Sequence, residues 1–300
     1  MNKQFSFPLT DKEAVLLEPY KYITETPGKG VRALLIESFN HWLKVEDRVV
    51  KEVSSLVQSL HMSSLLIDDI EDNSLLRRGT PTAHTLYGVP QTINCANFVY
   101  FLSIEQCMRL GNHQATQVYI EELVRSHRGQ GWDIYWRDNQ ICPTEDEYKS
   151  MVKDKTGGLF RMGLRVLQCF SENKTDYTLL IDNLALYYQI RDDYLNLVSG
   201  DYHNFKTFCE DITEGKYSYP VIRAMLNDPT DTRLKTILKQ RTTSADIKQC
   251  ALDYLKKTGA LEQTKEVINQ YREKILMQIE ELGGNPLFYK IMEKLEQISI

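Results

Sequence analysis

The stretch that decides the fold is VSSLVQSLHMSSLLIDDIED, residues 53–72. Its apolar residues at 53, 56, 57, 60 and 67 have the spacing of one helical face. Asp68 and Asp72 stand one turn apart on a shared face, and Asp69 lies about 100° round the helix from Asp68. Like charges at this spacing repel each other without a counter-ion. The alternatives are an acidic helix end exposed to water and a cation site, for which oxygen ligands of this kind suit Mg²⁺.

The rest of the chain has the same helical character. Helix-start signals stand at Thr10 with Glu13 and at Thr144 with Glu147, and no alternating strand pair or hairpin signal interrupts the pattern. The length alone suggests about two domains, but the pattern favours a single all-α domain over residues 1–300. We expect helices at 11–25, 30–43, 47–73, 83–110, 113–139, 145–171, 176–199, 216–227, 231–240, 245–257, 260–282 and 286–298, with 199–215 as the longest polar interruption.

Composition excludes several classes of protein. The 36 basic and 41 acidic residues give a net charge of −5, which disfavours a nucleic-acid binder. The six cysteines form no Cys-x-x-Cys pair, so we expect free thiols and a cytoplasmic location. The longest stretch free of charged side chains, residues 80–104, is too polar for a membrane span. Peripheral contact with a membrane stays open.

Basic residues and a second acidic pair extend the first motif. Arg77 and Arg78 come just past the expected helix end, starting five residues after Asp72, and adjacent guanidinium groups suit phosphate oxygens. Asp192 and Asp193 lie on another expected helix, with Asn196 one turn after Asp192. Two such clusters facing each other across a bundle predict Mg²⁺ held around one diphosphate. A di-iron bundle is the rival interpretation, but the chain contains no Glu-x-x-His.

These motifs together carry a family resemblance. The chain resembles the trans-isoprenyl diphosphate synthase family, FPP/GGPP synthase type, and within it the geranylgeranyl diphosphate synthases. The resemblance covers nearly the whole chain. The motifs that carry it are PGKGVR (27–32), FNHWL (39–43), LLIDDIEDNS (65–74), GQGWDIYWRD (129–138), KTGGLF (155–160), QIRDDY (189–194) and CEDITEGK (209–216).

The resemblance implies a bundle around a central active-site cavity, and a Mg²⁺-dependent 1′-4 condensation of isopentenyl diphosphate with an allylic diphosphate. It implies a homodimer, which some relatives assemble into a hexamer. It implies three Mg²⁺ ions per site on Asp68, Asp69, Asp72 and Asp192. The allylic diphosphate would contact Arg77, Lys155, Thr156, Gln189, Lys206 and Lys216, of which Lys155, Thr156 and Gln189 are the catalytic contacts. Isopentenyl diphosphate would contact Gly28, Lys29, Arg32, His61 and Arg78, while Gln130 and Asp133 match a further family element.

Product length is expected to follow from what blocks the tunnel beneath Asp68. The small side chains of Ser63 and Ser64 leave room there and predict a C20 product. In the most similar relatives the floor falls at positions matching Tyr100, Phe101 and His127, which ordinary core packing explains equally well. The alternatives are a farnesyl diphosphate or mixed-length synthase, a non-catalytic regulatory subunit with the same fold, and a class I terpene cyclase. Intact aspartates argue against the regulatory subunit, and Lys29, Arg32 and His61 argue against the cyclase.

Overall fold

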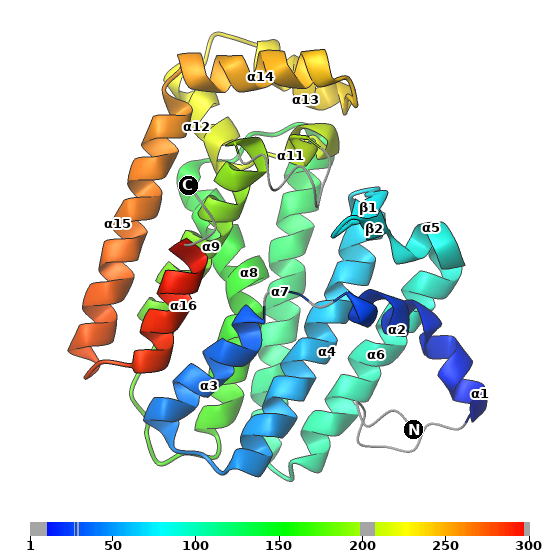
Figure 1. Ribbon diagram of the computed structural model, residues 1–300, viewed down its shortest axis with the longest axis vertical. Coiled ribbons are helices and arrows are strands. Elements are labelled where there is room, and N and C mark those ends of the chain that lie inside the picture. The colour runs from blue at the N-terminus through cyan, green and yellow to red at the C-terminus, as the bar shows by residue number, and fades with distance from the viewer. Residues whose placement is uncertain (1–10, 27, 29, 199–207, 297–300) are drawn as a thin grey trace. The chain divides into compact units, whose positions relative to one another are not determined.

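The computed structural model describes residues 11–26, 28, 30–198 and 208–296 (Figure 1). Within them almost every element is a helix, so the all-α prediction is confirmed. The chain divides into two compact units, the first formed by residues 1–124, 159–176 and 285–293, and the second by 125–158, 177–284 and 294–300. Three helices contribute residues to both units: α7 (His113–Asn139), α8 (Glu145–Gln168) and α16 (Pro286–Glu296). A single domain over 1–300 stays a prediction.

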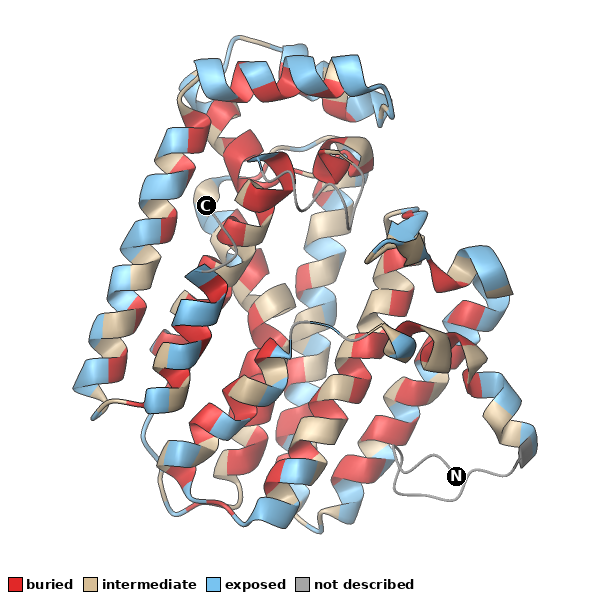
Figure 2. Ribbon diagram, viewed as in Figure 1, coloured by how far each residue is buried: buried red, intermediate tan, exposed pale blue. Residues whose placement is uncertain are grey.

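The first unit is built around the helix that the opening stretch predicts, α4 (Asp47–Glu71). Its apolar face, with Met62 and Leu66, packs into one core with Cys95, Val99 and Leu102 of α6. Burial of this face fixes the rotation of α4 and leaves a second face toward its end partly exposed (Figure 2). The other elements are α1 (Asp11–Ala14), η1 (Val15–Leu17), α2 (Glu18–Glu25), α3 (Val31–Leu43), β1 (Leu76–Arg77), β2 (Thr80–Pro81), α5 (Ala83–Tyr87) and α6 (Val89–Arg109).

The second unit is built around α9 (Thr178–Val198), which packs against α15 (Ala260–Glu281) and α12 (Tyr219–Asn227). Helix α9 is buried on several faces, and its buried residues include Arg191, Asp193 and Asn196. Burial of a polar or charged group costs free energy unless the group is hydrogen-bonded or paired. We therefore expect each of these side chains to have a partner in the interior of this unit. The remaining elements are α11 (Glu210–Glu214), α13 (Arg233–Gln240) and α14 (Ala245–Lys257).

Local chemistry explains where the structure departs from the expected elements. The expected helix 83–110 is broken at Gly88, whose φ of 78° is left-handed and which is followed by Pro90 at the start of α6. A short hairpin was not expected, because its turn is Arg78-Gly79 rather than Asn-Gly. Both residues have positive φ, 53° and 79°, as a type I′ turn requires. Helix α11 lies inside the expected interruption 199–215, of which 199–207 falls outside the described residues.

A membrane-crossing segment would have to combine length with apolar character. Within the part of the chain that the structure describes, none of the helices does so.

Candidate active site

Asp68, Asp69 and Asp72 lie at the C-terminal end of α4. The helix ends at Glu71, and the backbone N–H of Asp72 donates to the carbonyl of Asp68 at 2.9 Å. Carboxylates are unfavourable here, because the helix dipole already places partial negative charge at this end. This local cost makes the position attractive to a cation.

The hairpin after α4 brings such a cation, Arg77, against the acidic pair. Its Nε donates to Oδ1 of Asp69 at 2.7 Å, and its Nη2 lies 3.2 Å from Oδ2 of Asp68. Burial opposes the charge of Arg77, but the carboxylates of Asp69 and then Asp68 raise its pKa above the ordinary value. The side chain of Asp69 is 2% exposed and that of Asp68 is 27% exposed. Asp69 is therefore enclosed with Arg77, while Asp68 also faces solvent.

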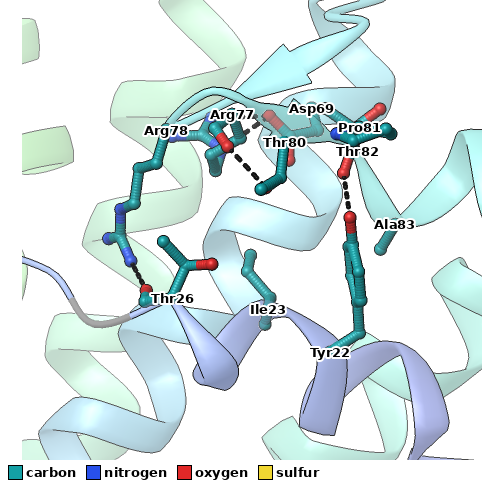
Figure 3. A pocket seen from close by; sticks show the side chains of 10 residues that line it. All are labelled: Tyr22, Ile23, Thr26, Asp69, Arg77, Arg78, Thr80, Pro81, Thr82 and Ala83. Atoms are coloured by element: carbon teal, nitrogen blue, oxygen red, sulfur yellow. Dashed lines mark hydrogen bonds and ion pairs between the residues drawn. The ribbon is translucent and has the colours of Figure 1, made fainter. Parts of the chain in front are cut away.

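A small pocket lies beside the hairpin (Figure 3) and holds about 20 Å³, room for one water molecule. Tyr22 of α2 crosses it and donates from its hydroxyl to the carbonyl of Pro81 at 2.7 Å. Arg78 points away from Arg77, and its Nη1 donates to the carbonyl of Thr26. These two bonds tie the hairpin to the α2 region, so the two adjacent arginines face different surroundings.

Arg32 of α3, His61 of α4 and Arg78 form a second cluster in the first unit. Nη1 of Arg32 lies 2.9 Å from Nε2 of His61. Burial, followed by the charges of Arg32, Arg78 and Arg77, lowers the pKa of His61 well below its ordinary value. His61 is therefore neutral and accepts the hydrogen bond from Arg32, since a guanidinium has no acceptor. Two guanidinium groups flanking a neutral imidazole suit a phosphate-type anion.

Gly28 lies directly against this cluster. A Cβ added to Gly28 would stand 2.9 Å from Nη2 of Arg78. Any residue larger than glycine at position 28 would therefore push the guanidinium of Arg78 out of its place. The structure thus brings together four of the five residues expected to bind isopentenyl diphosphate. The fifth, Lys29, lies outside the described residues.

In the second unit the buried carboxylate of Asp193 collects four hydrogen-bond donors. Oδ1 accepts from Nε2 of Gln189 at 2.9 Å and from Nζ of Lys216 at 3.2 Å. Oδ2 accepts from the hydroxyl of Tyr148 at 2.6 Å and from the backbone N–H of Tyr219 at 2.8 Å. Tyr219 is the first residue of α12, so the carboxylate also sits at the positive end of a helix.

The charge state of this network follows from its surroundings. Burial opposes the charge of Lys216, but Asp193 and then Asp211 raise the pKa of its ammonium well above the ordinary value. Burial, followed by the charge of Asp193, raises the pKa of Tyr148 well above its ordinary value. Lys216 is therefore charged and Tyr148 is a neutral donor at every physiological pH.

The catalytic contacts expected from the resemblance join this network through Gln189. Thr156 of α8 donates from its hydroxyl to Oε1 of Gln189 at 2.7 Å. Its neighbour Lys155 forms an ion pair of 2.6 Å with Oδ2 of Asp133 on α7. The structure thus brings Thr156, Gln189 and Lys216 into one chain of hydrogen bonds. Lys206, predicted to join them, lies outside the described residues.

The predicted metal ligands are carboxylates at the end of α4 and on α9. Asp68, Asp72 and Asp192 are each partly exposed, whereas Asn196 is 4% exposed and its Oδ1 accepts from the backbone N–H of Asp211 at 3.1 Å. Among the described residues, no three His, Cys, Asp or Glu side chains converge on a point that a metal could occupy. Carboxylate oxygens in ones and twos still fit Mg²⁺, which completes its octahedron with water and phosphate oxygens.

The residues expected to set product length do not share one environment. Ser63 is buried, and the hydroxyl of Ser64 donates to the carbonyl of His61 at 2.8 Å. Burial, followed by the charges of Glu71 and Asp68, raises the pKa of Tyr100, which places its hydroxyl within electrostatic reach of the acidic helix end. Phe101 is 69% exposed, and His127 is also exposed.

Sequence reasoning missed Tyr148 and Gly129. Tyr148 stands a heptad before Lys155 on the same face of α8, and this spacing was the available signal. Gly129 is buried where α7 meets α8, and a Cβ there would stand 2.9 Å from Cα of Lys155 and from the carbonyl oxygen of Met151. The close approach of two helix backbones cannot be inferred from one isolated glycine.

Comparison with known proteins shows the family of the chain. Residues 13–255 match the family model described as polyprenyl synthetase. The chain is 57% identical to the geranylgeranyl pyrophosphate synthase of Dictyostelium discoideum, over 99% of this chain and 98% of that protein. It is 47% identical to the geranylgeranyl pyrophosphate synthase of Mucor circinelloides f. lusitanicus, over 94% and 93%. A protein named terpene synthase from Matsumurasca onukii is 48% identical, over 95% and 94%. The resemblance seen in the motifs is thereby confirmed: the chain belongs to the polyprenyl synthetase family.

Proposed function

We propose that this protein is a prenyltransferase that makes C20 geranylgeranyl diphosphate, chiefly from farnesyl diphosphate and isopentenyl diphosphate. The observation that carries the proposal is the cluster of Arg32, His61 and Arg78. It is a phosphate-type anion site separate from the carboxylate-bound Arg77. An enzyme that condenses two diphosphates needs two such sites, whereas a terpene cyclase needs one. The matched geranylgeranyl pyrophosphate synthases support the choice of product.

The roles of the residues follow from their chemistry. Arg77, Lys155 and Lys216 carry the positive charge that would bind the allylic diphosphate and stabilise it as it leaves. The oxygens of Thr156 and Gln189 would stabilise the allylic cation that remains. On the other substrate, Arg32 and Arg78 would hold the isopentenyl diphosphate so that its double bond attacks that cation. Diphosphate takes the final proton, so no side chain is assigned as general base.

The family uses Mg²⁺, and Mg²⁺ when bound supplies Lewis-acid stabilisation of the leaving diphosphate. We propose Asp68, Asp72 and Asp192 as its protein ligands, because their carboxylates are partly exposed. Asp69 was predicted with them, but its enclosure with Arg77 favours holding that guanidinium. Three ions per site remains the prediction.

A homodimer is proposed through the outer face of α6. Val89, Ile93, Phe101 and Met108 stand on that face and are each more than a third exposed. We propose that a second copy of this chain covers them, because four large apolar side chains exposed along one helix are costly in water. Ile93→Asp should then halve the mass measured by light scattering, and an unchanged mass would contradict this face. A hexamer and a cytoplasmic location stay predictions.

The proposed product length rests on Ser63 and Ser64. Replacing Ser64 with Phe puts an aromatic ring one turn before Asp68 and should shorten the product from C20 to C15. Chromatography of the dephosphorylated products measures this, and an active variant that still makes C20 would show that the floor lies elsewhere.

The test of the reaction itself is incubation of the full chain with Mg²⁺, isopentenyl diphosphate and each allylic primer in turn. Geranylgeranyl diphosphate from the farnesyl primer supports the proposal. The relative named terpene synthase makes a cyclase the second candidate. Release of hydrocarbon or alcohol from an allylic diphosphate without isopentenyl diphosphate would favour it and overturn the condensation.

A further inference from the structure

The acidic pair Asp192-Asp193 contains two carboxylates in unlike surroundings. Asp192 is partly exposed, whereas Asp193 is 1% exposed in the interior of the second unit. Adjacent residues on a helix point about 100° apart, so one carboxylate can face a ligand while the other is buried. The two aspartates therefore need not do the same work.

The hydrogen bonds of Asp193 use its whole acceptor capacity. An ionised carboxylate has about four lone-pair sites, and each oxygen of Asp193 accepts two donors, at 2.9 and 3.2 Å on Oδ1 and at 2.6 and 2.8 Å on Oδ2. A metal ion bound to either oxygen would have to displace Tyr148, Tyr219, Gln189 or Lys216. Three of these donors are neutral, so the site is built to hold one anion rather than to share it with a metal.

The bond to Gln189 also fixes which way its amide points. Nε2 donates to Asp193, so Oε1 must be the atom that faces Thr156, whose hydroxyl donates to it at 2.7 Å. A flip of the amide would set Oε1 against the carboxylate of Asp193 and lose that bond, because neither oxygen can donate, although the Thr156 hydroxyl could still accept from Nε2. The same carboxylate holds the ammonium of Lys216.

We propose that Asp193 is a positioning residue that orients the amide of Gln189 and the ammonium of Lys216, and that it is not a metal ligand. This inference rests on the proposed function, which assigns those two groups to the allylic diphosphate. We expect its loss to lower activity on the order of 10- to 100-fold, the range found for residues that orient metal ligands by hydrogen bonds.

The test compares Asp193→Asn with its neighbour Asp192→Asn as the matched control. Calorimetry measures binding of inorganic diphosphate to the full chain at low and at high Mg²⁺. A higher Mg²⁺ concentration partly compensates for a lost metal ligand. The loss of diphosphate affinity in Asp192→Asn should therefore be smaller at high Mg²⁺ than at low Mg²⁺. The loss of diphosphate affinity in Asp193→Asn should be the same at both Mg²⁺ concentrations. If high Mg²⁺ reduced the loss of diphosphate affinity in Asp193→Asn as much as in Asp192→Asn, the proposal would be overturned.

Turnover supplies the second readout. We expect kcat of Asp193→Asn to fall with KM for isopentenyl diphosphate unchanged, and the loss to be non-additive with Gln189→Leu in a double-mutant cycle. Additive losses would overturn the proposal. If the wild type makes no prenyl diphosphate, the proposed function fails, but the calorimetric comparison still decides the role of Asp193.

A third variant covers the case in which Asp193→Asn does not fold. Tyr148→Phe removes one of the four donors and keeps the carboxylate. It should lower kcat several-fold and leave the Mg²⁺ dependence of diphosphate binding as in the wild type. A changed Mg²⁺ dependence in this variant would count against a purely positioning role.

Discussion

Replacing Gly129 with alanine should damage both the stability of the protein and its turnover. The added Cβ would stand 2.9 Å from Cα of Lys155 and from the carbonyl oxygen of Met151. The backbone N of Lys155 would lie closer still. Non-bonded carbon atoms normally stand about 3.5 Å or more apart, so the backbones of α7 and α8 must separate by more than roughly 0.6 Å. These are backbone atoms, and no side-chain rotation can relieve the contact.

The magnitude is a balance of two terms. Overpacking of this kind costs roughly 1–3 kcal/mol, while alanine in place of glycine inside a helix returns about 1 kcal/mol. We expect a net loss near 1 kcal/mol, or a fall in Tm of roughly 2 °C for a chain of this size. Because the ammonium of Lys155 pairs with Asp133 at 2.6 Å, the shift also moves a group proposed to bind diphosphate. Misplacement by about 1 Å can cost on the order of 100-fold in rate.

The matched control is Gly131→Ala, two residues further along α7. A Cβ at Gly131 meets nothing within 4 Å, so this variant should be more stable than the wild type by about 0.5–1 kcal/mol and fully active. Thermal unfolding and steady-state kinetics measure both. If Gly129→Ala matched Gly131→Ala in stability and kcat, the close approach of the two helices would not be what requires glycine.

Three further outcomes are expected. Gly28→Ala should displace the guanidinium of Arg78 and raise KM for isopentenyl diphosphate several-fold in steady-state kinetics; an unchanged KM would separate Arg78 from that substrate. The folded state keeps His61 neutral because burial lowers its pKa, so only the unfolded state binds a proton as pH falls below about 6.5. The free energy of unfolding should then fall by up to about 1.4 kcal/mol per pH unit, and chemical denaturation of His61→Gln should show a shallower pH dependence. Iodoacetamide at pH 8 should label the exposed Cys250 first by peptide mass spectrometry, and not the buried cysteines whose pKa burial raises to about 11, namely Cys95, Cys107 and Cys209.

The helices and the identity of the acidic motifs could be predicted from the sequence, because both rest on local patterns. The 3.6-residue spacing of apolar residues placed α4 and α9 to within two residues at each end. The break at Gly88 was missed although Pro90, two residues later, was an available signal, since proline is tolerated in the first turn of a helix but not in its interior. The hairpin at Arg78-Gly79 was missed because arginine rarely adopts the positive φ of a type I′ turn.

Partnerships between distant residues could not be predicted in the same way. No local pattern shows that the hydroxyl of Tyr148 reaches Asp193, 45 positions further along the chain. The exposure of Phe101 was also hidden, since a phenylalanine in a helical stripe is more often buried than not. Spacing gives the face of a helix on which a residue lies, but only the packing of other helices decides what that face meets.

The two acidic pairs make this point most clearly, because the sequence treats their members as equivalent. In each pair the first aspartate is partly exposed and the second is buried, Asp69 at 2% and Asp193 at 1%. A buried carboxylate is tolerated only with a charged or strongly donating partner, and each has one, Arg77 for Asp69 and Lys216 for Asp193. Under the proposed function, burial of the second carboxylate would hold in place a cation for a phosphate, and the first carboxylate would be left to bind metal. Two adjacent like charges, unfavourable on an isolated helix, become complementary once packing has separated their surroundings.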